Sequence, residues 1–198
     1  MTRIIAGRWG GRRLDVPPRG TRPTTDRVRE AVFSRLDHGD YLRGARVLDL
    51  FAGSGALAFE ALSRGASHAT AVEADGRAVA VLRANARSLD AGSTARIVKE
   101  RVRPFLARSD SAWDVVLLDP PYDIPRAELA EVLALVSSAV APDGIVVLEW
   151  ATRAGEAPWP VGLAETAAKA YGETMVRYAS PRTADGGGDA AEGGSVES

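Results

Sequence analysis

In the middle of the chain, short apolar runs alternate with segments whose apolar residues recur at helical spacing. Five runs have the length of buried strands, at Val47–Leu50, His68–Glu73, Ala95–Val98, Asp114–Leu118 and Gly144–Trp150. Between them the apolar spacing predicts helices over about 56–64, 76–89, 103–108 and 126–140. Strands that alternate with helices favour an open, mostly parallel α/β sheet with helices on both faces.

The two ends of the chain depart from this alternation. Leu163–Ala170 and Glu173–Ala179 flank Gly172 and predict a closing antiparallel hairpin. Near the start, Thr24 or Thr25 could cap a helix that runs to about Leu36. We therefore expect a small N-terminal extension over 1–40, an α/β domain over 41–180 and a disordered acidic tail over 181–198.

Composition excludes several classes of protein. The 198 residues contain no cysteine and only two histidines, so disulfides and thiolate metal sites are excluded and a multi-histidine metal site is disfavoured. No apolar run approaches the roughly 18 residues of a membrane span, and the first residues lack the apolar core of a signal peptide. We expect a cytoplasmic protein with no metal and no membrane partner.

Positive charge is concentrated at the start of the chain. Although the net charge is only -1, residues 1–35 hold nine arginines against three acids, a local charge of +6. Arginine binds phosphate through a planar fork, so an arginine-rich arm suits a nucleic-acid backbone. The alternative is an ordinary solvated surface.

A glycine-rich turn follows the first predicted strand of the sheet. It reads Asp49-Leu50-Phe51-Ala52-Gly53-Ser54-Gly55, and its glycines let the backbone approach a ligand closely. Asp49 would repel a pyrophosphate but would favour the ammonium or sulfonium of S-adenosylmethionine (SAM). Glu73 ends the second strand, where a carboxylate can accept hydrogen bonds from ribose hydroxyls, and Asp75 is a nearby competitor for that role.

A second constellation, Asp119-Pro120-Pro121-Tyr122, directly follows the fourth predicted strand. Ligands bind at the carboxyl edge of open α/β sheets, and two prolines fix the backbone there. Asp119 and the Pro120 carbonyl can each accept a hydrogen bond from an –NH2 group, which would aim the nitrogen lone pair at a methyl group. Tyr122 offers a flat face on which an extruded base can stack. The pattern therefore predicts methyl transfer to the exocyclic amine of a nucleic-acid base.

Together these motifs resemble the class I SAM-dependent methyltransferases, whose sheet is Rossmann-like. The start of the chain adds Arg3-Ile4-Ile5-Ala6-Gly7, Gly11-Arg12-Arg13-Leu14 and Arg22-Pro23-Thr24-Thr25-Asp26-Arg27-Val28-Arg29-Glu30, which are similar to the amino-terminal signature of the bacterial RsmD family. The resemblance covers about residues 1–180. It implies transfer of a methyl group to N2 of a guanine in 16S ribosomal RNA, within the small ribosomal subunit or an assembly intermediate.

The resemblance also implies roles for particular residues. Related enzymes often hold the adenine amine with a polar residue after the third strand, where Arg101 or the Val102 backbone would serve here. Catalytic roles fall on Asp119, Pro120, Pro121 and Tyr122. The cofactor set is Asp49, Phe51, Ala52, Gly53, Ser54, Gly55, Glu73, Ala74, Arg101 and Val102. The expected substrate contacts are Arg3, Arg8, Arg12, Arg13, Arg22, Thr24, Arg27 and Glu30.

Three other functions remain open at this point. A DNA amino-methyltransferase acting on adenine or cytosine would use the same Asp119–Tyr122 motif, although the chain has no extra target-recognition domain. A non-catalytic ribosome-assembly protein could keep the fold, but the intact motif argues against it. A NAD-dependent oxidoreductase is the most remote reading, because Asp49 disfavours a pyrophosphate.

Overall fold

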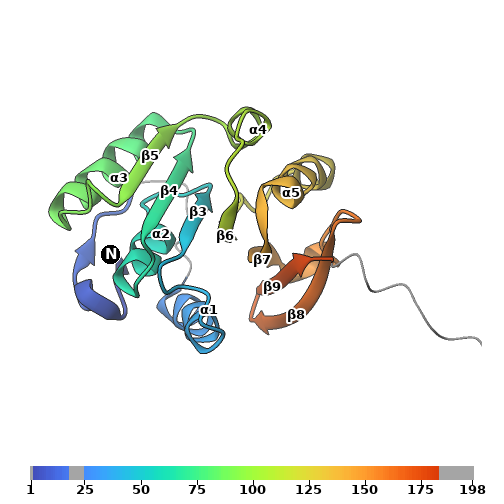
Figure 1. Cartoon of the computed structure of the whole chain (residues 1–198), viewed down its shortest axis with the longest axis horizontal. Helices are drawn as coiled ribbons and strands as arrows, with labels where there is room; N and C mark the ends of the chain where they lie inside the picture. The colour runs from blue at the N-terminus through green and yellow to red at the C-terminus, as the bar shows by residue number, and fades with distance from the viewer. Residues whose placement is uncertain (1, 18–24, 183–198) are drawn as a thin grey trace, which may run out of the picture.

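A computed structural model describes residues 2–17 and 25–182 of the chain. Its centre is a seven-stranded sheet in the order β5-β4-β3-β6-β7-β9-β8 (Figure 1). The parallel strands are β3 (Arg46–Leu50), β4 (His68–Glu73), β5 (Ala95–Lys99), β6 (Trp113–Leu118) and β7 (Val140–Ala151). The mostly parallel sheet predicted from the apolar runs is therefore confirmed.

The antiparallel hairpin at the carboxyl end is also confirmed. β8 (Leu163–Tyr171) and β9 (Thr174–Pro181) pair with each other, and β9 pairs antiparallel with β7. The sheet runs further than predicted, because Pro181 belongs to β9 and the Arg182 N–H donates to the Gly162 carbonyl at 3.0 Å. Both residues were assigned to the expected tail. Residues 183–198 lie outside the described part of the chain.

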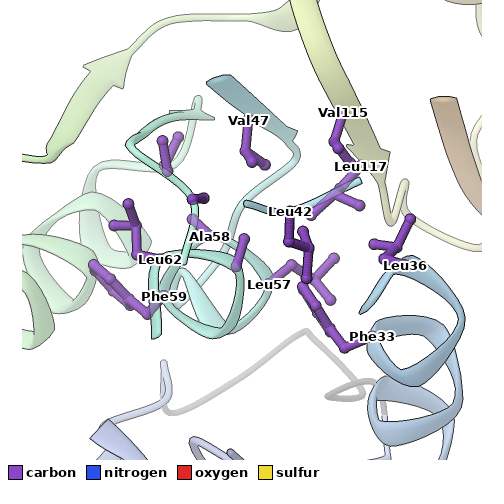
Figure 2. Packing of buried hydrophobic residues seen from close by; sticks show 14 of the residues in the cluster. Phe33, Leu36, Leu42, Val47, Leu57, Ala58, Phe59, Leu62, Val115 and Leu117 are labelled. Atoms are coloured by element: carbon purple, nitrogen blue, oxygen red, sulfur yellow. The ribbon is translucent and has the colours of Figure 1, made fainter. Parts of the chain in front are cut away.

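Helices cover the two faces of the sheet. They are α1 (Asp26–His38), α2 (Ala56–Ser63), α3 (Gly76–Ser88), α4 (Val102–Ala107) and α5 (Arg126–Ala139). One apolar cluster joins α1, α2 and α3 to one face, and Figure 2 shows Phe33 and Leu36 packing toward Leu57 and the strand residue Leu117. A second cluster joins α4 and α5 to the other face.

Local hydrogen bonds and strand pairing set the start of α1 and the end of α5. The Thr25 hydroxyl accepts the Val28 N–H at 3.3 Å and caps α1, as one of the two predicted threonines should. α5 ends one residue earlier than predicted and β7 begins at once, four residues before the expected Gly144. The early start occurs because Val140 pairs with Trp113 ahead of a register shift in β6.

The amino-terminal segment, residues 2–17, packs against the sheet domain. It contains β1 (Thr2–Arg3), the 3-10 turn η1 (Gly7–Trp9) and β2 (Arg13–Leu14), which pairs antiparallel with β1. Ile4 and Leu14 are fully buried in the α1–α3 cluster. The amino-terminal segment therefore contributes apolar side chains to the main core as well as arginines to the surface. Elsewhere in the chain, a second 3-10 turn, η2 (Thr152–Ala154), follows β7.

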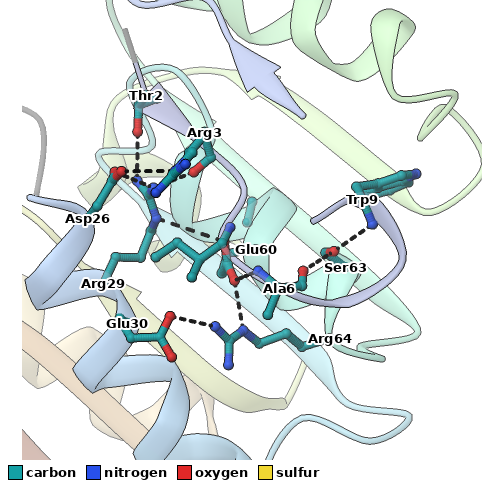
Figure 3. Close-up of polar contacts among 12 residues, drawn as sticks. Thr2, Arg3, Ala6, Trp9, Asp26, Arg29, Glu30, Glu60, Ser63 and Arg64 are labelled. Carbon is teal, nitrogen blue, oxygen red and sulfur yellow. Dashed lines mark hydrogen bonds and ion pairs between the residues drawn. The ribbon is translucent and has the colours of Figure 1, made fainter. Parts of the chain in front are cut away.

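Buried polar groups hold this segment in place, as Figure 3 shows. The fully buried Glu60 on α2 accepts the N–H groups of Ile5 and Ala6 at 2.7 and 3.1 Å. The fully buried Arg29 on α1 donates to the Thr2 hydroxyl at 2.9 Å and to the Arg3 carbonyl. Buried charges persist only when paired and hydrogen-bonded, as these two are, so the network fixes the segment across α1 and α2.

Candidate active site

The two predicted loops meet at one edge of the sheet. β3 and β6 are adjacent parallel strands, and Leu50 is the register partner of Leu118. On the other side of β3, Leu50 pairs with Val72 of β4. The turn after Leu50, the acid Glu73 and the acid Asp119 therefore follow three neighbouring strands at the same level. At this point the strand order reverses, because β4 lies on one side of β3 and β6 lies on the other. Ligands usually bind at such a reversal in open α/β sheets.

Positive backbone φ angles shape the glycine turn. Gly53 and Gly55 have φ values of 54° and 82°, and Gly55 directly precedes α2. A Cβ at Gly55 would lie 2.3 Å from Leu82 Cδ1, so a larger residue at position 55 would also clash with Leu82. Phe51 adopts φ 63° without being glycine, a strained conformation that occurs more often at functional sites.

Glu73, rather than Asp75, faces the turn. The Glu73 Oε2 atom accepts the Gly53 N–H at 2.9 Å, and Oε1 accepts the Asp75 N–H at 2.8 Å. Each oxygen retains a lone pair for a further donor. Asp75 caps α3 instead, because its Oδ1 accepts the N–H groups of Arg77 and Ala78 at 2.9 Å each. Of the two candidate acids, Glu73 is the one oriented for a ligand at the turn.

Asp49 lies beneath the turn and is fully buried. Its Oδ2 accepts the Ala58 N–H at 3.0 Å, while Oδ1 has no hydrogen-bond partner among the described residues. Burial raises the pKa of Asp49 to about 8, the Ala58 hydrogen bond opposes that rise, and the charges of Asp119 and Glu73 add to it. The carboxyl is thus mostly protonated at neutral pH, and a cation bound nearby would favour loss of its proton.

A cavity of about 780 Å³ opens between the turn, α4 and α5. Its walls combine apolar side chains with charged residues at the rim, which is typical of small-molecule sites. The lining residues are Phe51, Val72, Glu73, Ala74, Asp75, Arg101, Val102, Arg103, Pro104, Ala107, Pro121, Glu128, Val132 and Leu135.

Half of the predicted cofactor residues line this cavity. They are Phe51, Glu73, Ala74, Arg101 and Val102. The other five, Asp49, Ala52, Gly53, Ser54 and Gly55, form the turn and the buried carboxyl behind it. A nucleoside fits this arrangement, with Glu73 available to ribose hydroxyls and apolar walls available to a base. The unpartnered Asp49 oxygen adds a carboxyl that would respond to a positive charge.

The Asp119–Tyr122 loop borders the same cavity. Pro121 lines it, Pro120 is buried, and Asp119 is half-buried beyond the end of β6. Tyr122 is 46% exposed, and its hydroxyl lies 3.3 Å from the Thr174 Oγ1 atom on β9. Of this loop only Pro121 lines the cavity; Asp119, Pro120 and Tyr122 do not, and the exposed Tyr122 ring follows directly after Pro121 in the chain.

The predicted substrate residues are spread over the amino-terminal segment and α1. Arg3 pairs with Asp26 at 3.5 Å, Arg8 lies 3.9 Å above the Trp9 ring centroid, and Arg12 donates to the Ser88 carbonyl at 2.5 Å. Trp9 is half-buried, packs against the core and stacks on Arg8.

The remaining residues predicted to contact the substrate differ in their exposure and in their contacts. Arg13 and Arg27 are exposed. Glu30 is engaged in structure, because its carboxylate lies 3.4 Å from the Arg64 guanidinium and accepts the Ser34 hydroxyl at 3.1 Å. Arg22 and Thr24 lie outside the described residues.

Sequence patterns did not reveal several residues of the site. The α4 and α5 walls of the cavity were missed, although Glu128, Val132 and Leu135 recur at helical spacing and could have been noticed as a second face of α5. Glu149 was also missed. It is buried on β7 and follows Leu148, the partner of Leu118, so it is the strand neighbour of Asp119. Its only signal is an acid near the end of a long apolar run.

Within residues 2–17 and 25–182, no cluster of three or more histidine, aspartate or glutamate side chains is arranged to hold a metal ion. Among the helices described here, none is both long and apolar enough to cross a membrane.

Comparison with known proteins places the chain among methyltransferases. The family described as "Conserved hypothetical protein 95" matches residues 2–180. Ribosomal RNA small subunit methyltransferase D of Escherichia coli is 38% identical over 191 residues, covering 95% of this chain and 93% of the relative. The protein of the same name from Haemophilus influenzae is 39% identical over 151 residues, covering 74% and 77%.

A solved structure agrees with these sequence relatives. The Escherichia coli protein described as methyltransferase YhhF superimposes with a TM-score of 0.81 at 36% identity, covering 90% of this chain and 97% of that one. The expected Rossmann-like class I methyltransferase fold is therefore confirmed.

Proposed function

Because this chain belongs to the RsmD family of methyltransferases, we propose that it transfers a methyl group from SAM to the exocyclic N2 of a guanine in 16S ribosomal RNA. The observation that carries the proposal is the pairing of Leu50 with Leu118. It brings the glycine turn and the Asp119–Tyr122 loop together at one edge, where a methyl donor and a base amine have to meet.

The residues proposed to hold SAM are those of the turn and the cavity. Glu73 would accept hydrogen bonds from the ribose hydroxyls, and the walls near Val102 would contact the adenine. Asp49, with its unpartnered oxygen, would face the positive end of the ligand. SAM would supply a methyl group on a sulfonium: the carbon–sulfur bond breaks, its electron pair stays on sulfur as a thioether, and a nitrogen–carbon bond forms.

The residues proposed to handle the base amine follow β6. An aromatic amine is a weak nucleophile because its lone pair is delocalised into the ring. The Asp119 carboxylate and the Pro120 carbonyl would each accept one N–H, and this would direct the lone pair out of the ring plane. Positioning of this kind accounts for much of enzymatic rate enhancement. The nitrogen becomes far more acidic after transfer, so its proton can then pass to Asp119 or to water.

The substrate assignment is supported by the names of the relatives and by the charge of the amino-terminal segment. Both curated relatives cited above are named as methyltransferases of small-subunit ribosomal RNA. The exposed Arg8, Arg12 and Arg13 lie on this segment and could bind phosphates. We propose that the first 40 residues contact the RNA, within the small subunit or an assembly intermediate in the cytoplasm.

A methyl-transfer assay tests the proposal. The purified protein is incubated with isotopically labelled SAM and small ribosomal subunits from a strain that lacks the enzyme, and the RNA is digested to nucleosides for mass spectrometry. We expect the label in N2-methylguanosine of 16S ribosomal RNA. Label in an adenine or a cytosine, or preferential labelling of added DNA, would reject the guanine assignment.

A further inference from the structure

Asn85 of α3 joins two segments that are distant in sequence. It is only 2% exposed, and its Oδ1 atom accepts the Asp15 N–H at 2.9 Å. Its Nδ2 atom donates to the Asp15 carbonyl at 3.0 Å and to the Ser54 carbonyl at 2.9 Å. Both amide hydrogens are therefore used. One buried side chain thus connects the end of the amino-terminal segment to the glycine turn.

The connection continues through the turn to the proposed ribose ligand. Ser54 lies between Gly53 and Gly55, and the Gly53 N–H is the donor to Glu73 Oε2 at 2.9 Å. A shift of Asp15 would therefore act on Ser54 through Asn85, and on Glu73 through the neighbouring peptide. Coupling between sites is carried by contiguous hydrogen-bonded contacts of this kind.

The other part of the segment is anchored elsewhere. The Trp9 N–H donates to the Ser63 hydroxyl at 2.9 Å, and that hydroxyl donates to the Ala6 carbonyl at 2.5 Å. Ser63 is the last residue of the eight-residue α2, so it lies about 12 Å along the helix from the turn. Asn85 therefore links the amino-terminal segment to the glycine turn, whereas Ser63 fixes the segment at the far end of α2.

We propose that Asn85 is a positioning residue that couples the amino-terminal segment to the cofactor turn. Binding of SAM at the turn then steadies Asp15, and RNA held by the segment favours the turn geometry that binds SAM. The two effects must be equal, because a coupling free energy between two sites acts in both directions. The inference rests on the proposed function, since it takes the turn as the SAM site and the segment as an RNA contact.

Hydrogen exchange of a single amide tests the coupling without any activity measurement. The Asp15 N–H is followed by NMR with and without saturating S-adenosylhomocysteine, whose binding is measured separately by calorimetry. We expect exchange to slow by about fivefold or more in the native chain, which is the lower end of typical allosteric coupling. In Asn85→Ala the effect of the ligand on this amide should be lost.

Two further variants make the result specific. Asn85→Asp keeps the size of the side chain and the acceptor for Asp15 but loses both donated bonds, so it should also lose the effect and covers the case in which Asn85→Ala does not fold. Ser63→Ala loosens the segment at Trp9 without touching the turn, and it should keep the effect.

The possible failures separate the two proposals. If S-adenosylhomocysteine binds the native chain but leaves Asp15 exchange unchanged, or protects it equally in Asn85→Asp, the coupling through Asn85 is wrong and the methyltransferase proposal stands. If S-adenosylhomocysteine does not bind the native chain, the cofactor assignment is wrong and this inference is overturned with it.

Discussion

The backbone N–H of Gly53 donates to the Glu73 carboxylate over 2.9 Å and thereby ties the turn after β3 to the end of β4. Together with the Asp75 N–H, which donates to the other carboxylate oxygen of Glu73, this bond orients the acid. Glu73 and Asp75 both line the cavity, but Asp75 caps α3 through its Oδ1 atom, whereas the Glu73 carboxylate is turned toward the glycine turn.

Replacing Glu73 should therefore weaken cofactor binding. In Glu73→Ala the ribose hydroxyls would lose a charged acceptor and the Gly53 N–H would lose its partner, so we expect a loss of about 2 kcal/mol in the binding of S-adenosylhomocysteine by calorimetry. Glu156→Ala is the matched control, because Glu156 is exposed and does not line the cavity. Equal affinities for Glu73→Ala and the native chain would contradict the assignment.

The buried Asp49 should make stability depend on pH. Its pKa is raised to about 8 in the folded chain from an ordinary value of 3.8, so between these values the native state holds a proton that the unfolded chain has released. Its stabilising contribution is complete below pH 3.8 and is lost as the pH rises toward 8.

Asp49→Asn removes this titration. Urea unfolding at pH 5 and pH 8 should show that the variant gains stability relative to the native chain as the pH rises, by up to about 4 kcal/mol, because each pH unit between the unfolded and folded pKa values is worth about 1.4 kcal/mol. A difference in unfolding free energy that stays constant across this range would show that the Asp49 carboxyl is not perturbed.

The approach of the amino-terminal segment to α2 predicts contrasting effects at two glycines. Gly7 and Gly11 both have φ near 80°, but a Cβ at Gly7 would lie 1.9 Å from the Ser63 carbonyl oxygen, whereas nothing lies within 4 Å at Gly11. Gly11→Ala should cost roughly 1–2 kcal/mol for the left-handed backbone alone. Gly7→Ala should cost at least about 1 kcal/mol more, because the backbone has to move. Equal losses in denaturant unfolding would mean that the segment does not lie against α2 as described.

In the polar network that holds the amino-terminal segment, replacing the buried Glu60 should destabilise the fold much more than replacing the half-exposed Glu30. Glu60→Ala would leave the Arg64 Nε–H and two backbone N–H groups without their acceptor. It would also remove the buried carboxylate that lies 3.9 Å from the Arg29 guanidinium, so we expect a cost of about 3–5 kcal/mol. Glu30 contacts the same Arg64 but is 48% exposed, so Glu30→Ala should cost less than about 1 kcal/mol. Thermal or urea unfolding of both variants checks this, and a similar cost for both would contradict the buried pairing.

The sequence predicted those parts of the site that lie along single strands. Apolar runs locate strand ends, and parallel strands present those ends at one edge, so Glu73 and Asp119 could be placed together without coordinates. The helical spacing of Glu128, Val132 and Leu135 marks one face of α5, but it does not show that this face and α4 enclose a cavity, because that depends on how the two helices pack against each other. The link from Asp15 through Asn85 to Ser54 joins residues 70 and 31 positions apart and leaves no local pattern.

The amino-terminal segment shows a second limit of sequence analysis. Its arginines indicated a surface for nucleic acid, but its buried contacts gave no such signal, since Ile4 and Leu14 are isolated apolar residues among charged ones. The network of Glu60, Ser63 and Arg29 is assembled from three segments and could be seen only in the structure.

Separation of cofactor binding from methyl transfer at Asp119 tests the central claim most directly. In Asp119→Ala, single-turnover transfer to 16S ribosomal RNA at saturating SAM should fall by at least about a hundredfold, the scale of a lost positioning or proton-accepting group. The affinity for S-adenosylhomocysteine should change little, and Asp123→Ala, an exposed acid in the same loop, should transfer at the native rate. Normal transfer by Asp119→Ala would contradict the account, because the loop after β6 would then not hold the reacting amine.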